Sequence, residues 1–170
     1  MAKWIIDPGH SEVQFKVKHL AISNVTGTFK MFKGEVEGEN FDNAKVLCSI
    51  EVSSLDTNNP PRDKDLKSDI FFDAQQFPLI TFEGMLRRDE LVGDLTIHGI
   101  VKRVVMNVTF TGQGKDRFNN ERAGFEIDGK INRKDFGLNF NMLTETGSFV
   151  VGEEIKLHFD VEIIKQTLNE

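Results

Sequence analysis

The side chains of this sequence that could carry out chemistry are few and scattered. Its four histidines show neither the His-x-His nor the His-Glu-x-x-His spacing that zinc sites use, so no metal site is predicted. His10 follows Asp7 in a short turn, where hydrogen bonding within the turn is its expected role. The single cysteine, Cys48, lies on the apolar side of an alternating segment, which predicts an inert buried thiol. Since no Gly-x-Ser-x-Gly elbow is present either, the sequence predicts no enzyme and no cofactor.

Two polar features remain as candidate ligand contacts. His19 is the last inward residue of the first alternating segment, so it is expected near one end of the fold. It is interpreted either as a hydrogen-bonded histidine at the rim or as a polar contact for a ligand head group, which suits a mostly apolar pocket. The run Arg62-Asp63-Lys64-Asp65 has two similar interpretations. It could hold a head group, or its acidic residues could simply complement the dipole at the start of a helix.

The composition excludes several classes of protein. The 170 residues carry 21 Lys and Arg against 27 Asp and Glu, and the resulting net charge of −6 argues against a nucleic-acid partner. The length and the 39 % of hydrophobic residues fit a single domain over residues 1–170. No segment reaches the length of a membrane span, and the sequence opens without the apolar run of a secretory leader. The expected location is cytoplasmic, or periplasmic if a leader was removed.

Aromatic residues are the unusual part of this composition, with 15 Phe, one Trp and no Tyr. Almost none of these rings carries a hydroxyl or an N–H group that would need a buried hydrogen-bond partner. The sequence therefore predicts an interior that stays apolar, and the functional question is whether that interior is solid or hollow.

Alternation of apolar and polar residues dominates the chain and predicts about eight β-strands. The apolar positions lie within 13–19, 25–31, 44–52, 80–86, 91–97, 104–110, 125–131 and 155–163. The segment 58–68 differs, because a capping residue, two prolines and a polar run predict one short helix. The stretch 135–152 has a weaker pattern and is expected to be a long loop.

Eight antiparallel strands with one apolar face each are expected to close into a barrel. Closure removes exposed edges and leaves a lumen that side chains fill or that holds one ligand. Gly27, Gly84, Gly93 and Gly129 all lie on the inward side of their strands. They are interpreted as bends of a strongly curved sheet or as space for a bound molecule, and both interpretations favour a barrel.

The inward positions predict which residues would line such a lumen. Those expected along an apolar ligand are Phe15, Val17, Phe29, Met31, Cys48, Phe82, Met106, Val108, Phe125, Ile127 and Phe159. Phe110 lies on the same inward side. Phe71 and Phe72, which follow the helix, are expected to close one end, and His19 is the polar candidate at the mouth.

Several short motifs occur in order over nearly the whole chain. They include Asp7-Pro8-x-His10-Ser11, Val25-x-Gly27-x-Phe29, Arg62-Asp63-x-x-Leu66-x-Ser68, Gly93-x-Leu95-Thr96-Ile97-x-Gly99 and Arg133-x-Asp135-Phe136-Gly137. Each motif is weak alone, but together they resemble the YceI-like family of polyisoprenoid-binding proteins. The resemblance implies an extended, lipocalin-like barrel that holds a long isoprenoid or similar lipid, with a non-catalytic carrier or storage role and often a dimer. Asp65 stands where the family usually has histidine, so a head-group contact by that histidine is not carried over.

The sequence thus predicts binding, storage or transport of a long-chain amphiphilic lipid, such as a polyisoprenoid, an isoprenoid quinone or a fatty-acid-like molecule. Two alternatives stay open. One is an enzyme acting on a hydrophobic substrate, with His19 and a carboxylate such as Asp65 as acid and base. The other is a solid barrel, filled by its own side chains, that serves as an interaction module. The predicted partner is the lipid, without stable insertion into a membrane, and the surface charge neither requires nor forbids a homodimer.

Overall fold

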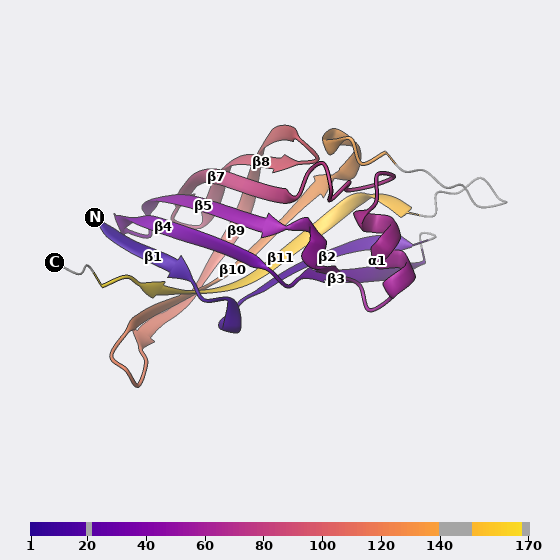
Figure 1. The fold of residues 1–170 in the computed structure, drawn as a ribbon. Helices are drawn as coiled ribbons and strands as arrows, with labels where there is room; N and C mark the ends of the chain where they lie inside the picture. Colours follow the sequence, from indigo (N-terminus) through magenta and orange to yellow (C-terminus); the bar gives the residue numbers. More distant parts are fainter. Residues whose placement is uncertain (20–21, 140–150, 168–170) are drawn as a thin grey trace.

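The protein folds into a strongly curved antiparallel sheet that closes on itself (Figure 1). The computed structural model describes residues 1–19, 22–139 and 151–167. The strands in these ranges are β1 (Ala2–Ile6), β2 (Glu12–His19), β3 (Ser23–Phe29), β4 (Phe32–Asn40), β5 (Asn43–Glu51), β6 (Leu55–Asp56), β7 (Leu79–Arg87), β8 (Glu90–Ile97), β9 (Ile100–Lys115), β10 (Glu121–Asn132) and β11 (Val151–Lys165). The helical elements are η1 (Pro8–His10), η2 (Val52–Ser54), α1 (Pro60–Lys67) and η3 (Arg133–Phe136).

Closure of the barrel depends on β1, which pairs with β4 on one side and with β11 on the other. The strands β1, β4, β5, β7, β8, β9, β10 and β11 therefore form a closed ring of eight. The predicted eight-stranded antiparallel barrel with one short helix is thus confirmed. The membership of the ring differs from the prediction, since β1 and β4 belong to it, whereas the predicted strands at 13–19 and 25–31, which are β2 and β3, lie outside it. The strands β2 and β3 continue the sheet from β11 outward and end at β6.

The two ends of the barrel are different. At one end the strands β1 and β11 lie side by side, with Trp4 of β1 opposite Lys165 of β11 (Figure 1). At the other end α1 lies next to β2 and β3 (Figure 1). We call the α1 end the mouth of the barrel and the other end the closed end.

The helix α1 forms where the sequence predicted it. The side chain of Asn59 caps its first turn by accepting a hydrogen bond from the Arg62 amide at 3.1 Å. Pro60 and Pro61 occupy the first turn, where no intrahelical N–H bond is lost. No helix among the described residues is long and apolar enough to cross a membrane. The predicted loop over 135–152 lies mostly outside the described residues, and its first residues belong to η3.

The inward side chains of the strands form one hydrophobic core. The predicted alternation is visible in β8, where Leu91, Leu95 and Ile97 are buried and Glu90 and Asp94 are exposed. Most of the aromatic rings are phenylalanines, which need no hydrogen-bond partner when they are buried in this core. The described residues contain no buried side-chain N or O atom without a hydrogen-bond partner. The interior of the barrel is therefore apolar, as the composition predicted.

Candidate ligand-binding site

Three cavities follow one another from the mouth into the barrel. The mouth cavity, of 210 Å³, lies between α1 and β2, and its lining includes His19 and Asp65. The middle cavity, of 50 Å³, and the deep cavity, of 100 Å³, lie inside the barrel. Neighbouring cavities share wall residues: Phe15 and Phe72 border the mouth and middle cavities, and Phe159 borders the middle and deep cavities. The three spaces thus form a row that side chains interrupt.

The barrier between the mouth cavity and the middle cavity is aromatic. The ring of Phe15 lies 5.5 Å from that of Phe29, and the ring of Phe29 lies 6.1 Å from that of Phe72 in an edge-on arrangement. We call these three residues the aromatic constriction. Phe72 in turn contacts Phe71 at 4.9 Å. All four rings are buried, so a molecule can pass from the mouth to the middle cavity only if rings of the constriction move.

The inward glycines provide space that the protein's own side chains fill. The pairs of glycine and covering side chain are Gly27 with Phe15, Gly84 and Gly93 with Phe82, and Gly129 with Met106. At Gly27, an added Cβ would lie 2.3 Å from Cζ of Phe15, far inside van der Waals contact. In this structure, therefore, the glycines accommodate neighbouring side chains and leave no free volume for a ligand at their own positions.

Most of the polar residues that line the three cavities lie at the mouth. Arg62 donates to the hydroxyl of Thr57 at 2.8 Å and to its carbonyl at 2.7 Å, and Asp63 accepts from the Thr57 amide at 2.9 Å. These bonds fix the start of α1 to the segment after β6. The half-buried His19 and the exposed Asp65 line the same cavity, and neither donates or accepts a side-chain hydrogen bond among the described residues. Within the run Arg62-Asp63-Lys64-Asp65, Asp63 thus stabilises the local fold by its hydrogen bond to Thr57, whereas Asp65 lines the mouth cavity.

The structure places most of the predicted lining residues at these cavities. Phe15, Val17, His19, Phe71 and Phe72 border the mouth cavity, Phe29 borders the middle cavity, and Cys48, Phe82, Met106, Ile127 and Phe159 border the deep cavity. Val108 and Phe125 are buried inside the barrel but line none of the three. The strand alternation therefore predicted inward orientation well, but it did not predict which inward residues meet an open space.

One predicted inward position is wrong, and a second is only half covered. Met31 is 53 % exposed, because β3 ends at Phe29 and the chain turns before β4 begins, so the alternation does not continue through Met31. Phe110 lies on the predicted side of β9, because it stands opposite Phe125 and its ring lies 5.5 Å from that of Phe125. It nevertheless remains 51 % exposed.

Three residues of the deep cavity, Ile6, Phe32 and Thr81, lie outside the predicted inward positions. Ile6 belongs to β1, and its alternation with the buried Trp4 was the signal that could have revealed it. Phe32 begins β4, directly after the turn that misplaced Met31. Neither Ile6 nor Phe32 lies in a segment for which inward positions were predicted.

The thiol of Cys48 lies in the wall of the deep cavity. Burial raises its pKa to about 11, because the thiolate would lose its hydration. The cysteine is therefore protonated at neutral pH, which agrees with the predicted inert thiol and gives no support for a nucleophile.

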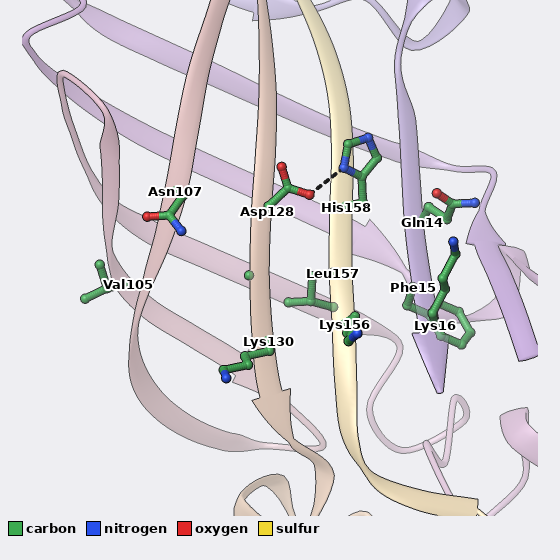
Figure 2. A pocket seen from close by; sticks show the side chains of 11 residues that line it. Gln14, Phe15, Lys16, Val105, Asn107, Asp128, Lys130, Lys156, Leu157 and His158 are labelled. Carbon is green, nitrogen blue, oxygen red and sulfur yellow. Dashed lines mark hydrogen bonds and ion pairs between the residues drawn. The ribbon is translucent and has the colours of Figure 1, made fainter. Parts of the chain in front are cut away.

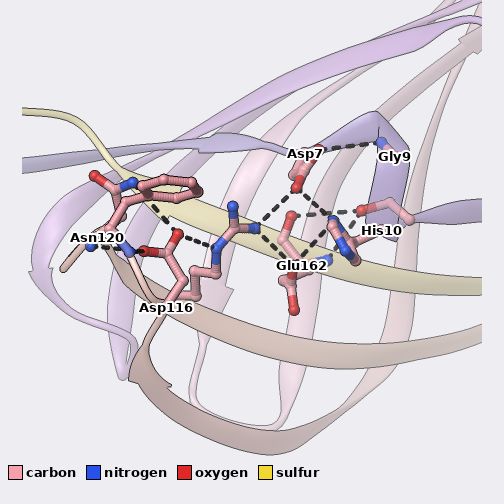
Figure 3. A network of polar contacts seen from close by, with 9 residues as sticks. Asp7, Gly9, His10, Asp116, Asn120 and Glu162 are labelled. Atoms are coloured by element: carbon pink, nitrogen blue, oxygen red, sulfur yellow. Dashed lines mark hydrogen bonds and ion pairs between the residues drawn. The ribbon is translucent and has the colours of Figure 1, made fainter.

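A second polar cluster lies away from the cavities and joins η1 to β11 and to the hairpin of β9 and β10 (Figure 3). Arg122 donates at 2.8 Å to each of three carboxylates, those of Asp7, Asp116 and Glu162. The guanidinium lowers the pKa of Asp7 and of Asp116, and the pKa of Arg122 itself is raised. His10 lies 2.7 Å from Asp7, so its predicted role within the turn is confirmed.

The same cluster contains a set of atoms that could in principle ligate a metal. Ligand-type atoms of Asp7, His10 and Glu162 lie within 4.8 Å of one another. Both carboxylates, however, already accept a hydrogen bond from Arg122, whose positive charge would repel a cation. The cluster is accordingly a network of ion pairs that holds the fold together.

The closed antiparallel ring with an apolar interior and a helix at its mouth defines a lipocalin-like β-barrel. Comparison with known proteins agrees, since the model of the YceI-like domain matches residues 4–163. A UPF0312 protein of Staphylococcus epidermidis is 38 % identical over 166 residues, which cover 95 % of this chain and 97 % of the relative. The chain therefore belongs to the YceI-like family.

Solved structures show the same fold. The Campylobacter jejuni YCEI protein is 32 % identical, with a TM-score of 0.71 over 89 % of this chain and 91 % of that one. A structure described as a polyisoprenoid binding domain from Saccharophagus degradans has a TM-score of 0.69 over 96 % of this chain and 98 % of its own. At 15 % identity the second comparison establishes the fold alone.

Proposed function

We propose that the protein binds the long apolar chain of an amphiphilic lipid in its barrel, with the polar head at the mouth. The observation that carries the proposal is the row of three cavities that leads from α1 into an almost wholly apolar interior. His19 and Asp65 are the groups placed to meet a head group. The Saccharophagus degradans domain supports an isoprenoid as the ligand class, and we extend this to isoprenoid quinones and fatty-acid-like chains.

Binding requires a rearrangement of the interior. The deep cavity of 100 Å³ holds only about three methylene-sized groups, if each takes the roughly 30 Å³ of a liquid water molecule. A chain must therefore displace the rings of the aromatic constriction and the side chains that cover the inward glycines. Phe15 lies over Gly27, and Phe82 lies over Gly84 and Gly93, so these two rings are among the side chains that must move.

The energy available for this rearrangement is large. Burial of about 20 tail carbons at about 0.8 kcal/mol per methylene gives on the order of 16 kcal/mol before costs. Association and the ordering of a flexible chain remove half of this or more. The remainder suits micromolar or tighter affinity without a strong polar contact, so selection acts on chain length and apolarity.

The arrangement at the mouth favours binding over catalysis. An acid and a base need to converge within hydrogen-bond reach of a reacting atom. His19 and Asp65 border one cavity, but no hydrogen bond joins them to each other or to another described residue that would orient them. We propose a carrier or storage protein, and not an enzyme, on this basis.

The test combines extraction with uptake. Mass spectrometry of an organic extract of the purified protein, together with titration by a polyprenyl quinone, is expected to reveal bound lipid and saturable uptake. Ile127→Phe, which fills the deep cavity, is expected to weaken uptake about tenfold, the effect of one or two misplaced methylenes. Val101→Phe, at a position on β9 that is 56 % exposed, is the matched control and is expected to bind like the wild type.

The small size of the inner cavities favours a second candidate, a filled barrel that acts as an interaction module. This candidate predicts no lipid in the extract and no uptake by the wild type. That result would refute the lipid proposal, and uptake that is equal in Ile127→Phe and wild type would place the lipid outside the lumen.

A further inference from the structure

A hollow larger than each of the three inner cavities lies on the outer wall of the barrel, not in its lumen. It has a volume of 810 Å³ and spans β9, β10, β11 and β2 (Figure 2). Its polar lining comes from the outward residues of these strands, including Lys16, Lys130, Lys156 and His158. None of these four side chains borders the three inner cavities, whereas Gln14, Phe15 and Leu157 line both the hollow and an inner cavity.

Three lysines stand in a row across the hollow. Lys130 of β10 is directly opposite Lys156 of β11, and Lys156 is directly opposite Lys16 of β2. Residues directly opposite on neighbouring strands have Cβ atoms about 5 Å apart, and like charges in such pairs destabilise a sheet. All three are exposed, and none forms an ion pair within the described chain. We call these residues the lysine row.

Two carboxylates flank the lysine row, and neither forms an ion pair with it. Asp128, two residues from Lys130, is engaged by Nδ1 of His158 at 2.7 Å (Figure 2). Nε2 of the same imidazole lies 3.1 Å from Asp160. The second carboxylate next to the lysine row is that of Glu154, two residues from Lys156 on β11. Like Asp128, Glu154 forms no ion pair with a lysine of the row. Three lysines without an ion pair thus stand side by side on a chain whose net charge is −6.

We propose that the lysine row is a binding site for an anion that carries clustered phosphate groups. Lysine binds phosphate as a point charge. Neighbouring strands are about 4.8 Å apart, so the outer two lysines of the row stand about 10 Å apart at their bases. When the three lysine side chains are fully extended, a single phosphate cannot contact all three ammonium groups, whereas two or three linked phosphates can. The amides of Gln14 and Asn107, which also line the hollow, supply further hydrogen-bond donors.

This chemistry has two sources, a soluble oligophosphate or the phosphate groups of an anionic lipid surface. Isothermal titration with inorganic tripolyphosphate tests the first. Co-sedimentation with vesicles of phosphatidylcholine and phosphatidylglycerol, against phosphatidylcholine alone, tests the second. Binding in either experiment supports the proposal and identifies the source, provided that it weakens when sodium chloride is raised from 20 to about 300 mM, where screening is strong.

The deciding variant is Lys16→Gln/Lys130→Gln/Lys156→Gln. It is expected to bind about 10-fold to 100-fold more weakly, the combined effect of three exposed charge pairs. The matched control is Lys33→Gln/Lys45→Gln/Lys115→Gln, which removes three exposed lysines of the same charge that are not opposite one another. The control is expected to bind nearly as well as the wild type.

A second readout is independent of ligand. Because like charges in a row are repulsive, the lysine-row variant without ligand is expected to melt roughly 1 to 3 °C above the wild type, while the control triple variant gains less. The absence of tripolyphosphate and vesicle binding by the wild type would overturn the proposal. Equal weakening in both triple variants would do the same, as would a switch in oligomeric state that accounts for the loss.

Discussion

Gly27→Ala tests whether the inward glycines exist to accommodate rings. The new Cβ would lie 2.3 Å from Cζ and 2.5 Å from Cε1 of Phe15, so the ring must move by about 1 Å to reach ordinary contact. Phe15 is buried and packs against Phe29, and overpacking of such a core costs about 1–3 kcal/mol. Alanine in a strand gains about 0.5–1 kcal/mol over glycine. The net expectation is a loss of about 1–2 kcal/mol in the free energy of unfolding.

The assay is urea unfolding followed by fluorescence of Trp4, the single tryptophan, which is buried in β1. Gly114→Ala is the matched control, because an added Cβ at Gly114 of β9 meets nothing within 4 Å. There the gain from alanine is unopposed, so the control is expected to be neutral or more stable by up to about 1 kcal/mol. The two substitutions are chemically identical and are expected to have opposite signs.

A double-mutant cycle isolates the proposed contact. In a Phe15→Leu background the ring is absent, so the penalty of Gly27→Ala is expected to fall by at least about 1 kcal/mol. If Gly27→Ala is as stable as the wild type, or if its penalty is unchanged by Phe15→Leu, the close approach of ring and glycine is not what the fold depends on. The interpretation that the inward glycines are needed to accommodate aromatic rings would then be wrong.

Three further outcomes are expected. Because the pKa of Cys48 is about 11, its reaction with Ellman's reagent at pH 8 should be at least about 100-fold slower in the native protein than in urea. Arg133 is fully buried and donates to three backbone carbonyl groups, so Arg133→Met should lower the free energy of urea unfolding by about 3 kcal/mol. Arg122 lowers the pKa of Asp7 and Asp116, so their contribution is present above pH 4 and is lost as pH falls through the lowered values. Arg122→Met should therefore be less stable than the wild type at pH 7, and the difference measured by urea unfolding should shrink between about pH 5 and pH 2.

The alternation of apolar and polar residues in the sequence was sufficient to predict most of the fold. Each barrel strand presents an apolar face inward, and this requirement is visible in alternate residues of the sequence, as in Leu91 and Leu95 of β8. The helix could be predicted for the same local reason, since its cap and prolines are adjacent in the chain. Met31 shows the limit of this reasoning, because alternation ends wherever a strand ends, and the sequence does not mark that point sharply.

The sequence by itself determined that the strands have one apolar face, that the interior carries rings without polar groups, and that a helix begins after Asn59. These properties depend on each residue and its near neighbours. Only the tertiary structure decided that β1 closes the ring, that Phe15 fills the space over Gly27, and that three lysines form a row. Each of these depends on the register between strands far apart in the chain, where a shift by one residue would reverse every side chain. Register is set by closure of the whole barrel, and local sequence does not contain it.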